Sequence, residues 1–240
     1  MKIIEKIIAK AENNADLRSP VIAFIGDSVT QGCFEIVPKN GGGFGDVQDR
    51  GNVYHAQLSK MLSVLYPSVP VNMINAGVAG YNAPHGLERL ERDVLVHKPD
   101  LTVVCFGLND CGKGDEGIEI YISSLREIFK KLRDAGSEII FMTPNMMATN
   151  SSPYLDEAFV ELTGKMVKWQ TSGTLDRYMD AARALCKEEN VVVCDCYAKW
   201  KKLYENGVDI TELLANRINH PVREMHGLFA VSLLETIMEG

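Results

Sequence analysis

The stretch from residue 21 to residue 30, VIAFIGDSVT, constrains the fold most strongly, because it joins a buried strand directly to a polar turn. Its first five residues are apolar, and three of them are β-branched. Such a run is typical of a strand that is covered on both faces in a parallel sheet. Ser28 then lies at the carboxyl edge of that sheet, where open α/β folds bind their ligands. Gly, Asp and Ser also favour ordinary turns, so this stretch alone leaves a purely structural interpretation equally open.

The rest of the chain alternates between strand and helix patterns. Short apolar runs predict four further strands, at residues 69–74, 101–106, 138–143 and 191–194. Apolar residues at helical spacing predict helices at residues 53–65, 84–97, 118–133, 174–190 and 222–238. With 240 residues, 46% of them hydrophobic, the chain is long enough to bury one full core. We therefore expect a single domain over residues 1–240, an α/β three-layer α/β/α sandwich around a five-stranded parallel sheet.

Residues 1–18 form an N-terminal helix and a link in this scheme. Four isoleucines recur there at helical spacing, at positions 3, 4, 7 and 8. This apolar face must cover either the domain itself or a partner subunit, and the second alternative predicts a homo-oligomer through this helix. Charged residues interrupt the opening residues, so they lack the apolar region of a signal peptide, and we expect a cytoplasmic protein.

Two connections are too long for simple strand–helix loops, which usually take only ~2–6 residues. Residues 145–173 are interpreted as a cap insertion over the sheet edge, lined by Met146, Met147, Tyr154 and Trp169. The alternative is a segment that only covers a pair of helices. Residues 29–51 are predicted to be a loop, and they contain the tract GGGFG at 41–45. Because this tract lies well beyond the strand and lacks Gly-Lys-Ser/Thr, we expect a mobile loop beside the site and no nucleotide binding.

Composition excludes several classes of partner. The net charge of −7 and the pI near 5.3, without a Lys/Arg cluster, argue against nucleic acid. Six cysteines are too sparse for a disulfide scaffold, and Cys194-x-Cys196 lacks the spacing of a zinc site, so no metal and no cofactor is expected. No apolar run approaches the ~20 residues of a membrane span.

The polar residues that follow the predicted strands supply the parts of an acyl-transfer site. Ser28, Gly80 and Asn109 each lie just after a strand, and His220 precedes the proline that opens the last helix. A serine hydroxyl is a weak nucleophile that needs a neighbouring base, which His220 would supply. A tetrahedral oxyanion needs fixed donors, and the candidates are the backbone N–H groups of Ser28 and Gly80 and the side-chain amide of Asn109. Asp27 and Asp110 flank the site, and we expect them to hold its loops by hydrogen bonds.

In this order, four segments resemble the signature blocks of the SGNH (GDSL) hydrolase superfamily. They are Gly26-Asp27-Ser28-x-Thr30, Gly77-x-x-Gly80, Gly107-x-Asn109-Asp110 and His220-Pro221. The resemblance implies a flavodoxin-like sandwich and a GDSL-like lipase/acylhydrolase, with Ser28 as nucleophile and His220 as base. It implies oxyanion donors at Ser28, Gly80 and Asn109. The G-x-S-x-G elbow of α/β-hydrolases would instead require glycine where this chain has Thr30.

The group that orients His220 is left open by the sequence. Most members of the superfamily carry aspartate three residues before the histidine, where this chain has Arg217, which cannot accept a hydrogen bond. Three acceptors remain. Asn216 lies on the face of His220 if residues 216–220 form a helical turn, Asp209 offers a carboxylate from further away, and a backbone carbonyl is the third. We place Asn216 first. His55, His85, His97 and His226 are interpreted as surface or packing residues.

The sequence thus predicts a serine esterase that cleaves a short-chain ester, such as an O-acetylated carbohydrate, through an acyl-enzyme on Ser28. A second interpretation keeps the same acyl-enzyme and passes it to an alcohol or a sugar, as an acyltransferase does. A third, from a different class, is a non-catalytic carbohydrate- or acyl-binding module with a degraded triad, suggested by Arg217. The joint presence of nucleophile, base and donors favours catalysis. The natural substrate, its acyl length and the oligomeric state do not follow from the sequence.

Overall fold

A computed structural model describes residues 1–39 and 43–239 of the chain. Its centre is a five-stranded, fully parallel sheet in the order β4-β1-β5-β6-β7. The strands are β1 (Val21–Gly26), β4 (Asn72–Gly77), β5 (Leu101–Cys105), β6 (Glu138–Met142) and β7 (Val192–Cys194). This is the doubly wound order of flavodoxin-like folds, whose topological switch point lies between β1 and β5. The predicted sheet and fold class are confirmed.

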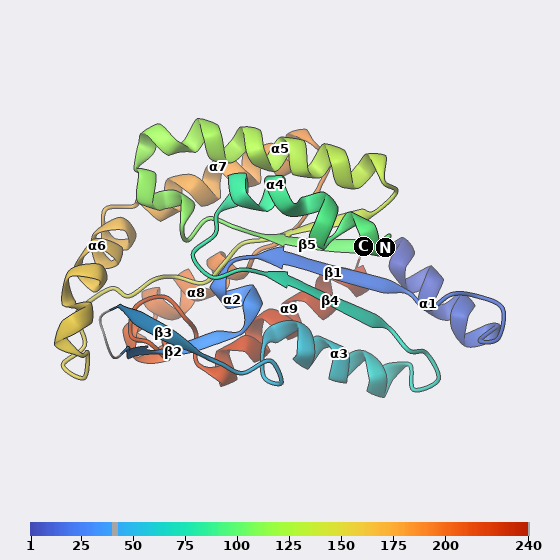
Figure 1. Ribbon diagram of the computed structural model, residues 1–240, viewed down its shortest axis with the longest axis horizontal. Coiled ribbons are helices and arrows are strands. Elements are labelled where there is room, and N and C mark those ends of the chain that lie inside the picture. Colours follow the sequence, from blue (N-terminus) through green and yellow to red (C-terminus); the bar gives the residue numbers. More distant parts are fainter. Residues whose placement is uncertain (40–42, 240) are drawn as a thin grey trace.

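Helices cover both faces of the sheet (Figure 1). On one face α4 packs against α5 and α5 against α7; on the other α9 packs against α3, α8 and α1. The helices are α1 (Lys2–Glu12), α3 (Tyr54–Leu65), α4 (Ala83–Asp93), α5 (Ile118–Asp134), α7 (Thr174–Glu188), α8 (Cys196–Glu205) and α9 (Arg223–Glu239). Short 3₁₀ helices lie at Leu95–His97, Asp110–Lys113, Asp115–Gly117, Glu157–Phe159 and Thr211–Leu213. Every residue of β1 is buried, as its sequence predicts.

The N-terminal helix covers its own domain. Ile3 and Ile7 are fully buried, and α1 contacts α9. Among residues 1–39 and 43–239, no helix has the length and apolarity needed to span a membrane.

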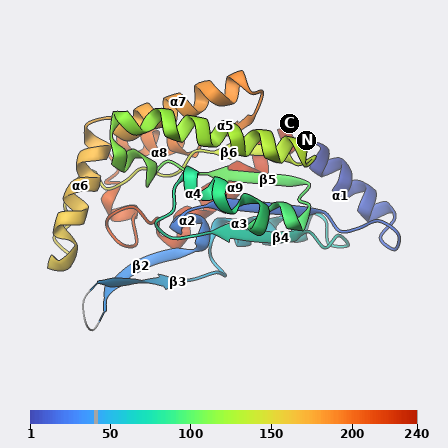
Figure 2. The ribbon, with the colours of Figure 1, turned by 45° about the horizontal axis from the view of Figure 1, so that its top comes forward.

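The prediction that residues 29–51 form a loop is wrong. The segment begins with the short helix α2 (Ser28–Gln31) and continues as an antiparallel hairpin of β2 (Cys33–Pro38) and β3 (Phe44–Gln48). Figure 2 shows this hairpin projecting from the sheet on the side where α2 lies. Of the tract at 41–45, which carried the expectation of a mobile loop, Gly41 and Gly42 lie outside the described residues, whereas Phe44 and Gly45 belong to β3. Helix α8, which begins two residues after the end of β7, was not predicted from the sequence.

The residues predicted to line a cap do not do so. Met146 and Met147 are buried in the core, whereas Tyr154 is 81% exposed to solvent. The ring of Trp169 packs against Gly112, where an added Cβ would lie 3.1 Å from it. The connection does form a helix, α6 (Val160–Thr171), which lies at the end of the molecule that also carries the hairpin (Figure 1).

Two motif glycines allow α2 to sit directly on the ends of β1 and β4. A Cβ at Gly26 would lie 2.2 Å from the Thr30 hydroxyl oxygen and 2.7 Å from the Cys105 carbonyl oxygen. A Cβ at Gly77 would lie 2.2 Å from the backbone nitrogen of Gln31. Because these neighbours are largely backbone, they cannot rotate away, and only glycine lets α2 approach the sheet.

We expect Gly77→Ala to lower the free energy of unfolding by about 1–3 kcal/mol, the usual cost of overpacking a dense interior. Gly164→Ala is the matched control, because its added Cβ, in helix α6, meets no atom within 4 Å. It should be neutral or stabilising, since alanine is the better helix former. Urea unfolding followed by circular dichroism measures both. Equal stabilities for the two variants would contradict the packing argument.

Candidate active site

Ser28 is held at the carboxyl edge of the sheet by the turn that ends β1. The carboxyl oxygen Oδ1 of Asp27 accepts a hydrogen bond from the Val29 N–H at 2.9 Å and so caps α2. The cap turns the serine out of the strand direction, as the first residue of α2. Ser28 is nevertheless buried, with only 5% of its surface exposed. Among the described residues, the Ser28 N–H donates no hydrogen bond to the protein. It is therefore free to serve a ligand.

The imidazole of His220 lies directly against this serine. Its Nε2 is 2.9 Å from the Ser28 hydroxyl oxygen, and its Nδ1 is 3.0 Å from the backbone carbonyl oxygen of Phe34. A carbonyl oxygen only accepts hydrogen bonds, so Nδ1 carries the proton and Nε2 is left to accept from the serine hydroxyl. Burial lowers the pKa of His220, opposed by the Phe34 carbonyl and by the charges of Asp46 and Glu35. The ring is thus a neutral, correctly oriented acceptor at neutral pH.

Asn216 does not contact the imidazole, so the prediction that it orients His220 is wrong. Its side-chain oxygen accepts hydrogen bonds from the backbone N–H groups of Ile218, Asn219 and His220 at 3.0, 2.9 and 2.9 Å. Residues 216–220 are not a helical turn, because Arg217 has a φ of +57°. Asn216 therefore shapes the loop that carries His220 and does not reach the ring.

Asp209 does not accept the Nδ1 proton of the ring either. Its carboxylate accepts hydrogen bonds from the side chain of Asn150 and from the backbone N–H of Thr211. Arg217 turns away too and pairs with Glu212 at 2.7 Å. Of the three acceptors that the sequence left open, the backbone carbonyl is the one that the structure places at Nδ1.

Gly80 and Asn109 line the same cavity as Ser28. Gly80 has a φ of +76°, which glycine adopts without strain, and its N–H donates no hydrogen bond within the described part of the chain. One amide hydrogen of Asn109 binds the Tyr81 carbonyl at 2.8 Å, which leaves the other for a ligand. The buried guanidinium of Arg89 binds the carbonyls of Gly26 and Ala76 at 2.9 and 2.6 Å and so ties the ends of β1 and β4 together.

These groups open into one cavity of about 360 Å³. Its polar floor comes from the predicted residues, Asn216 among them, and from Asn219. Its apolar walls come from the two long connections that the sequence places beside the sheet edge, but through residues that were not predicted to line the site. The walls are Ile36 and Phe44 of the hairpin and Leu162 and Met166 of α6. The hairpin and the α6 region also meet, since the rings of Phe44 and Phe159 lie 5.5 Å apart in an edge-on arrangement. Asp46 of β3 completes the rim.

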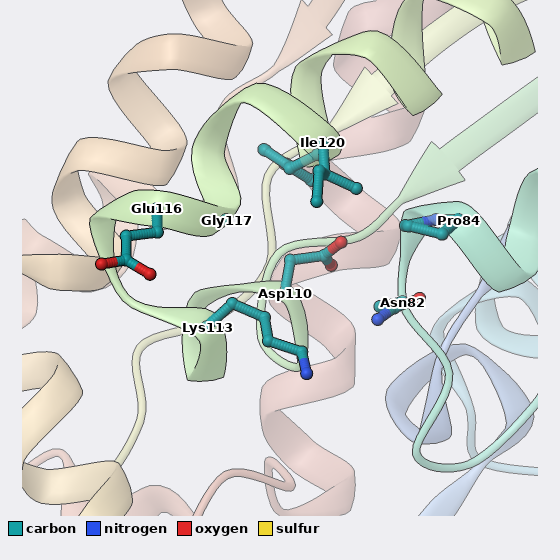
Figure 3. A pocket seen from close by; sticks show the side chains of 8 residues that line it. Asn82, Pro84, Asp110, Lys113, Glu116, Gly117 and Ile120 are labelled. Atoms are coloured by element: carbon teal, nitrogen blue, oxygen red, sulfur yellow. The ribbon is translucent and has the colours of Figure 1, made fainter.

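Asp110 faces a different cavity from its neighbour Asn109. Its carboxyl group lies between the side chains of Pro84, Lys113 and Ile120 (Figure 3), which line a cavity of about 330 Å³. One carboxyl oxygen accepts from the Ala83 N–H at 2.9 Å and fixes the start of α4. Burial raises the pKa of Asp110 to about 7, and burial likewise raises the pKa of Asp27 to about 7. Both carboxyls hold backbone turns, and within the described residues neither forms a hydrogen bond with Ser28 or His220.

The other histidines lie where packing or solvent explains them. His55 and His226 are buried and bind backbone groups of Thr30 and Tyr54, and burial lowers their pKa values to about 4 and about 3. His85 and His97 are exposed. Within residues 1–39 and 43–239, no group of histidine, cysteine and carboxylate side chains is arranged to hold a metal ion.

The parallel sheet, with a serine–histidine pair at the switch point and free donors around it, has the architecture of an SGNH hydrolase. The model of the GDSL-like lipase/acylhydrolase family matches residues 24–228, and the chain belongs to this family. It is accordingly a carboxylic ester hydrolase.

Relatives of known activity and structure agree with this assignment. An acetylxylan esterase from Geobacillus stearothermophilus is 24% identical over 225 residues, which are 90% of this chain and 93% of the relative. The crystal structure of Axe2, an acetylxylan esterase from that organism, superposes with a TM-score of 0.66 at 23% identity and covers 91% of this chain and 94% of its own. LAE5, an α/β hydrolase enzyme from the metagenome of Lake Arreo in Spain, gives a TM-score of 0.67 at 22% identity, with 91% and 96% covered.

The raised pKa of Asp27 makes the stability of the protein depend on pH. Between its ordinary pKa of 3.8 and its folded value of about 7, the folded state holds a proton that the unfolded state releases. The free energy of unfolding therefore falls as the pH rises through this window.

Asp27→Asn keeps the acceptor for Val29 and cannot ionise. Between about pH 4 and about pH 8 its free energy of unfolding should therefore fall by at least ~1 kcal/mol less than that of the wild type. Urea unfolding at both pH values measures this, with Asp134→Asn, which removes an exposed carboxylate, as the control. A wild-type pH dependence in Asp27→Asn would contradict it.

Proposed function

We propose that this protein is a serine esterase that removes short acyl groups, above all acetyl groups, from hydroxyls of a carbohydrate. The observation that carries the proposal is the 2.9 Å contact between Ser28 Oγ and His220 Nε2, with the opposite ring nitrogen held by a carbonyl. A hydroxyl so placed can give its proton to Nε2 as it attacks an ester carbonyl carbon.

The reaction then runs through an acyl-enzyme. The oxygen of Ser28 bonds to the carbonyl carbon, and His220 takes the hydroxyl proton on Nε2 and returns it to the departing alcohol oxygen. The oxyanion is stabilised by the N–H groups of Ser28 and Gly80 and the amide of Asn109, which are already in place before the reaction. A water molecule then gives a proton to His220 Nε2 as its oxygen bonds to the acyl carbon. The bond to the Ser28 oxygen breaks, that oxygen takes the proton from Nε2, and the free acid leaves.

A carbonyl at the ring in place of a carboxylate does not make the site a binding module. Catalytic mutants of Axe2 carry alanine in place of a serine, a histidine or an aspartate, and that aspartate precedes the histidine by three residues. Arg217 stands three residues before His220 in this chain, and the carbonyl of Phe34 accepts the Nδ1 proton instead. Orientation of the base is therefore preserved by a different acceptor, which supports catalysis.

The dimensions of the cavity support a small acyl group. A volume of about 360 Å³ accommodates an acetylated sugar unit more readily than a long acyl chain. The relatives described above as acetylxylan esterases point to the same substrate class.

The nucleophile is tested by labelling with a fluorophosphonate and mapping the modified peptide. We expect the label on Ser28, and Ser28→Ala should lose both the label and the hydrolysis of p-nitrophenyl acetate while its melting temperature stays close to that of the wild type. Ser63→Ala, which removes an exposed serine of α3, is the control and should behave as the wild type. Retention of more than a few per cent of turnover in Ser28→Ala would refute the mechanism. Acetate release from acetylated xylo-oligosaccharides, compared with release of longer acids, tests the substrate class.

A further inference from the structure

We propose that Arg223 is a positioning residue for this reaction, which holds the Phe34 carbonyl against His220 and so does the work that a third catalytic side chain does elsewhere. This inference rests on the proposed function. It concerns a residue that lies outside the four sequence blocks and outside the lining of the active-site cavity.

The Phe34 carbonyl is free to bind His220 because the hairpin is irregular at that point. Along the ladder, Cys33 pairs with Gln48 and Ile36 with Asp46, so Phe34 and Glu35 together oppose only Val47. An extra residue on one strand is a β-bulge, which leaves a residue unpaired and redirects its backbone. The bulge thus presents a main-chain acceptor to the active site, but it also removes the ladder hydrogen bonds that would hold that acceptor in place.

The hairpin has no support from the main sheet either. β2 and β3 form a separate two-stranded sheet, and an isolated hairpin is only marginally stable in water. A catalytic histidine, in contrast, needs its acceptor fixed closely, because a change of tautomer costs a serine protease about 10⁴-fold in kcat. Some other contact must therefore hold the bulge.

Arg223 makes that contact from the first turn of α9. Its Nη1 and Nη2 donate to the two carboxylate oxygens of Glu35 at 2.6 and 3.2 Å, and its Nε donates to Asp49 at 2.8 Å. The centre of the guanidinium also lies 4.3 Å from the centre of the Phe34 ring. The side chain of Arg223 therefore contacts both residues of the bulge, Phe34 and Glu35, and also Asp49, which follows β3.

Arg223 lies close to His220 in the chain. It follows His220 by three residues and lies on the same segment, so it ties the donor of the Nδ1 hydrogen bond to the strand that carries the acceptor. The buried Phe34 ring also packs against His226 of α9, at 4.8 Å between ring centres. Thus α9 fixes the hairpin relative to His220 from two sides.

The ion pairs of Arg223 are expected to position the hairpin without adding much to the stability of the fold. The side chains of Arg223, Glu35 and Asp49 are 33%, 41% and 27% exposed, and ion pairs with such access to water add little to the stability of a fold. Loss of the Arg223 contacts should therefore move the Phe34 carbonyl without unfolding the protein. A planar guanidinium is needed to bind two oxygens of one carboxylate and to lie on a ring, which the point charge of lysine cannot do.

The test is the steady-state kinetics of Arg223→Gln with p-nitrophenyl acetate, together with its melting temperature. We expect kcat to fall about tenfold to a hundredfold, well short of the ~10⁴-fold loss for a histidine with no acceptor, while KM stays within about twofold. Arg223→Lys should recover part of kcat. Arg133→Gln, which breaks an ion pair with Glu189 at the end of α5, is the control and should leave both constants unchanged.

A double mutant shows whether the effect runs through the hairpin. If Arg223 acts by holding Glu35, then Glu35→Gln should lower kcat, and adding it to Arg223→Gln should cost less than the two separate losses combined. Wild-type kcat in Arg223→Gln, a change confined to KM, or a loss of activity that follows a loss of folded protein would overturn the inference. If Ser28→Ala is inactive and Arg223→Gln is fully active, only this inference fails; if Ser28→Ala is active, the proposed function fails.

Discussion

The hydrogen bond from His220 Nδ1 to the carbonyl of Phe34 is the interaction on which the site depends. It fixes the tautomer of the ring and leaves Nε2 facing the serine at 2.9 Å. A carbonyl carries no net charge, so the buried histidine does not require a buried carboxylate beside it, with the desolvation cost that such a charge brings. Electrostatic support for the protonated ring comes instead from Asp46 and Glu35, whose charges oppose the effect of burial on the pKa of His220.

The sheet and four of the site residues can be predicted because local patterns encode them. Ser28, Gly80 and Asn109 each follow an apolar strand, and a parallel sheet brings the carboxyl ends of its strands to one edge. The acceptor for His220 cannot be predicted in this way, because it is a main-chain atom 186 positions away in the chain. The choice of Asn216 assumed a helical turn, and the left-handed conformation of Arg217 breaks that assumption.

The residues that form the walls of the cavity could not be predicted from local sequence patterns either. The hairpin was expected to be a loop because its strands are short, polar in part and separated by a glycine tract, yet its pairing brings Ile36 and Phe44 over the serine. The segment between β6 and α7 was expected to contribute Met146 and Tyr154, whereas its contribution comes from Leu162 and Met166 of α6. Periodicity predicts that such a helix exists, but only tertiary packing decides which of its residues face the site.

The tautomer of His220 in the resting enzyme tests the central claim most directly. Two-dimensional ¹H–¹⁵N correlation through the ring carbons distinguishes a protonated from an unprotonated nitrogen, and the His220→Ala spectrum assigns the signals. At about pH 7.5 the account predicts a neutral ring with the proton on Nδ1, because a carbonyl can only accept and burial lowers the pKa of this histidine. A neutral ring protonated on Nε2, or an imidazolium at that pH, would contradict it.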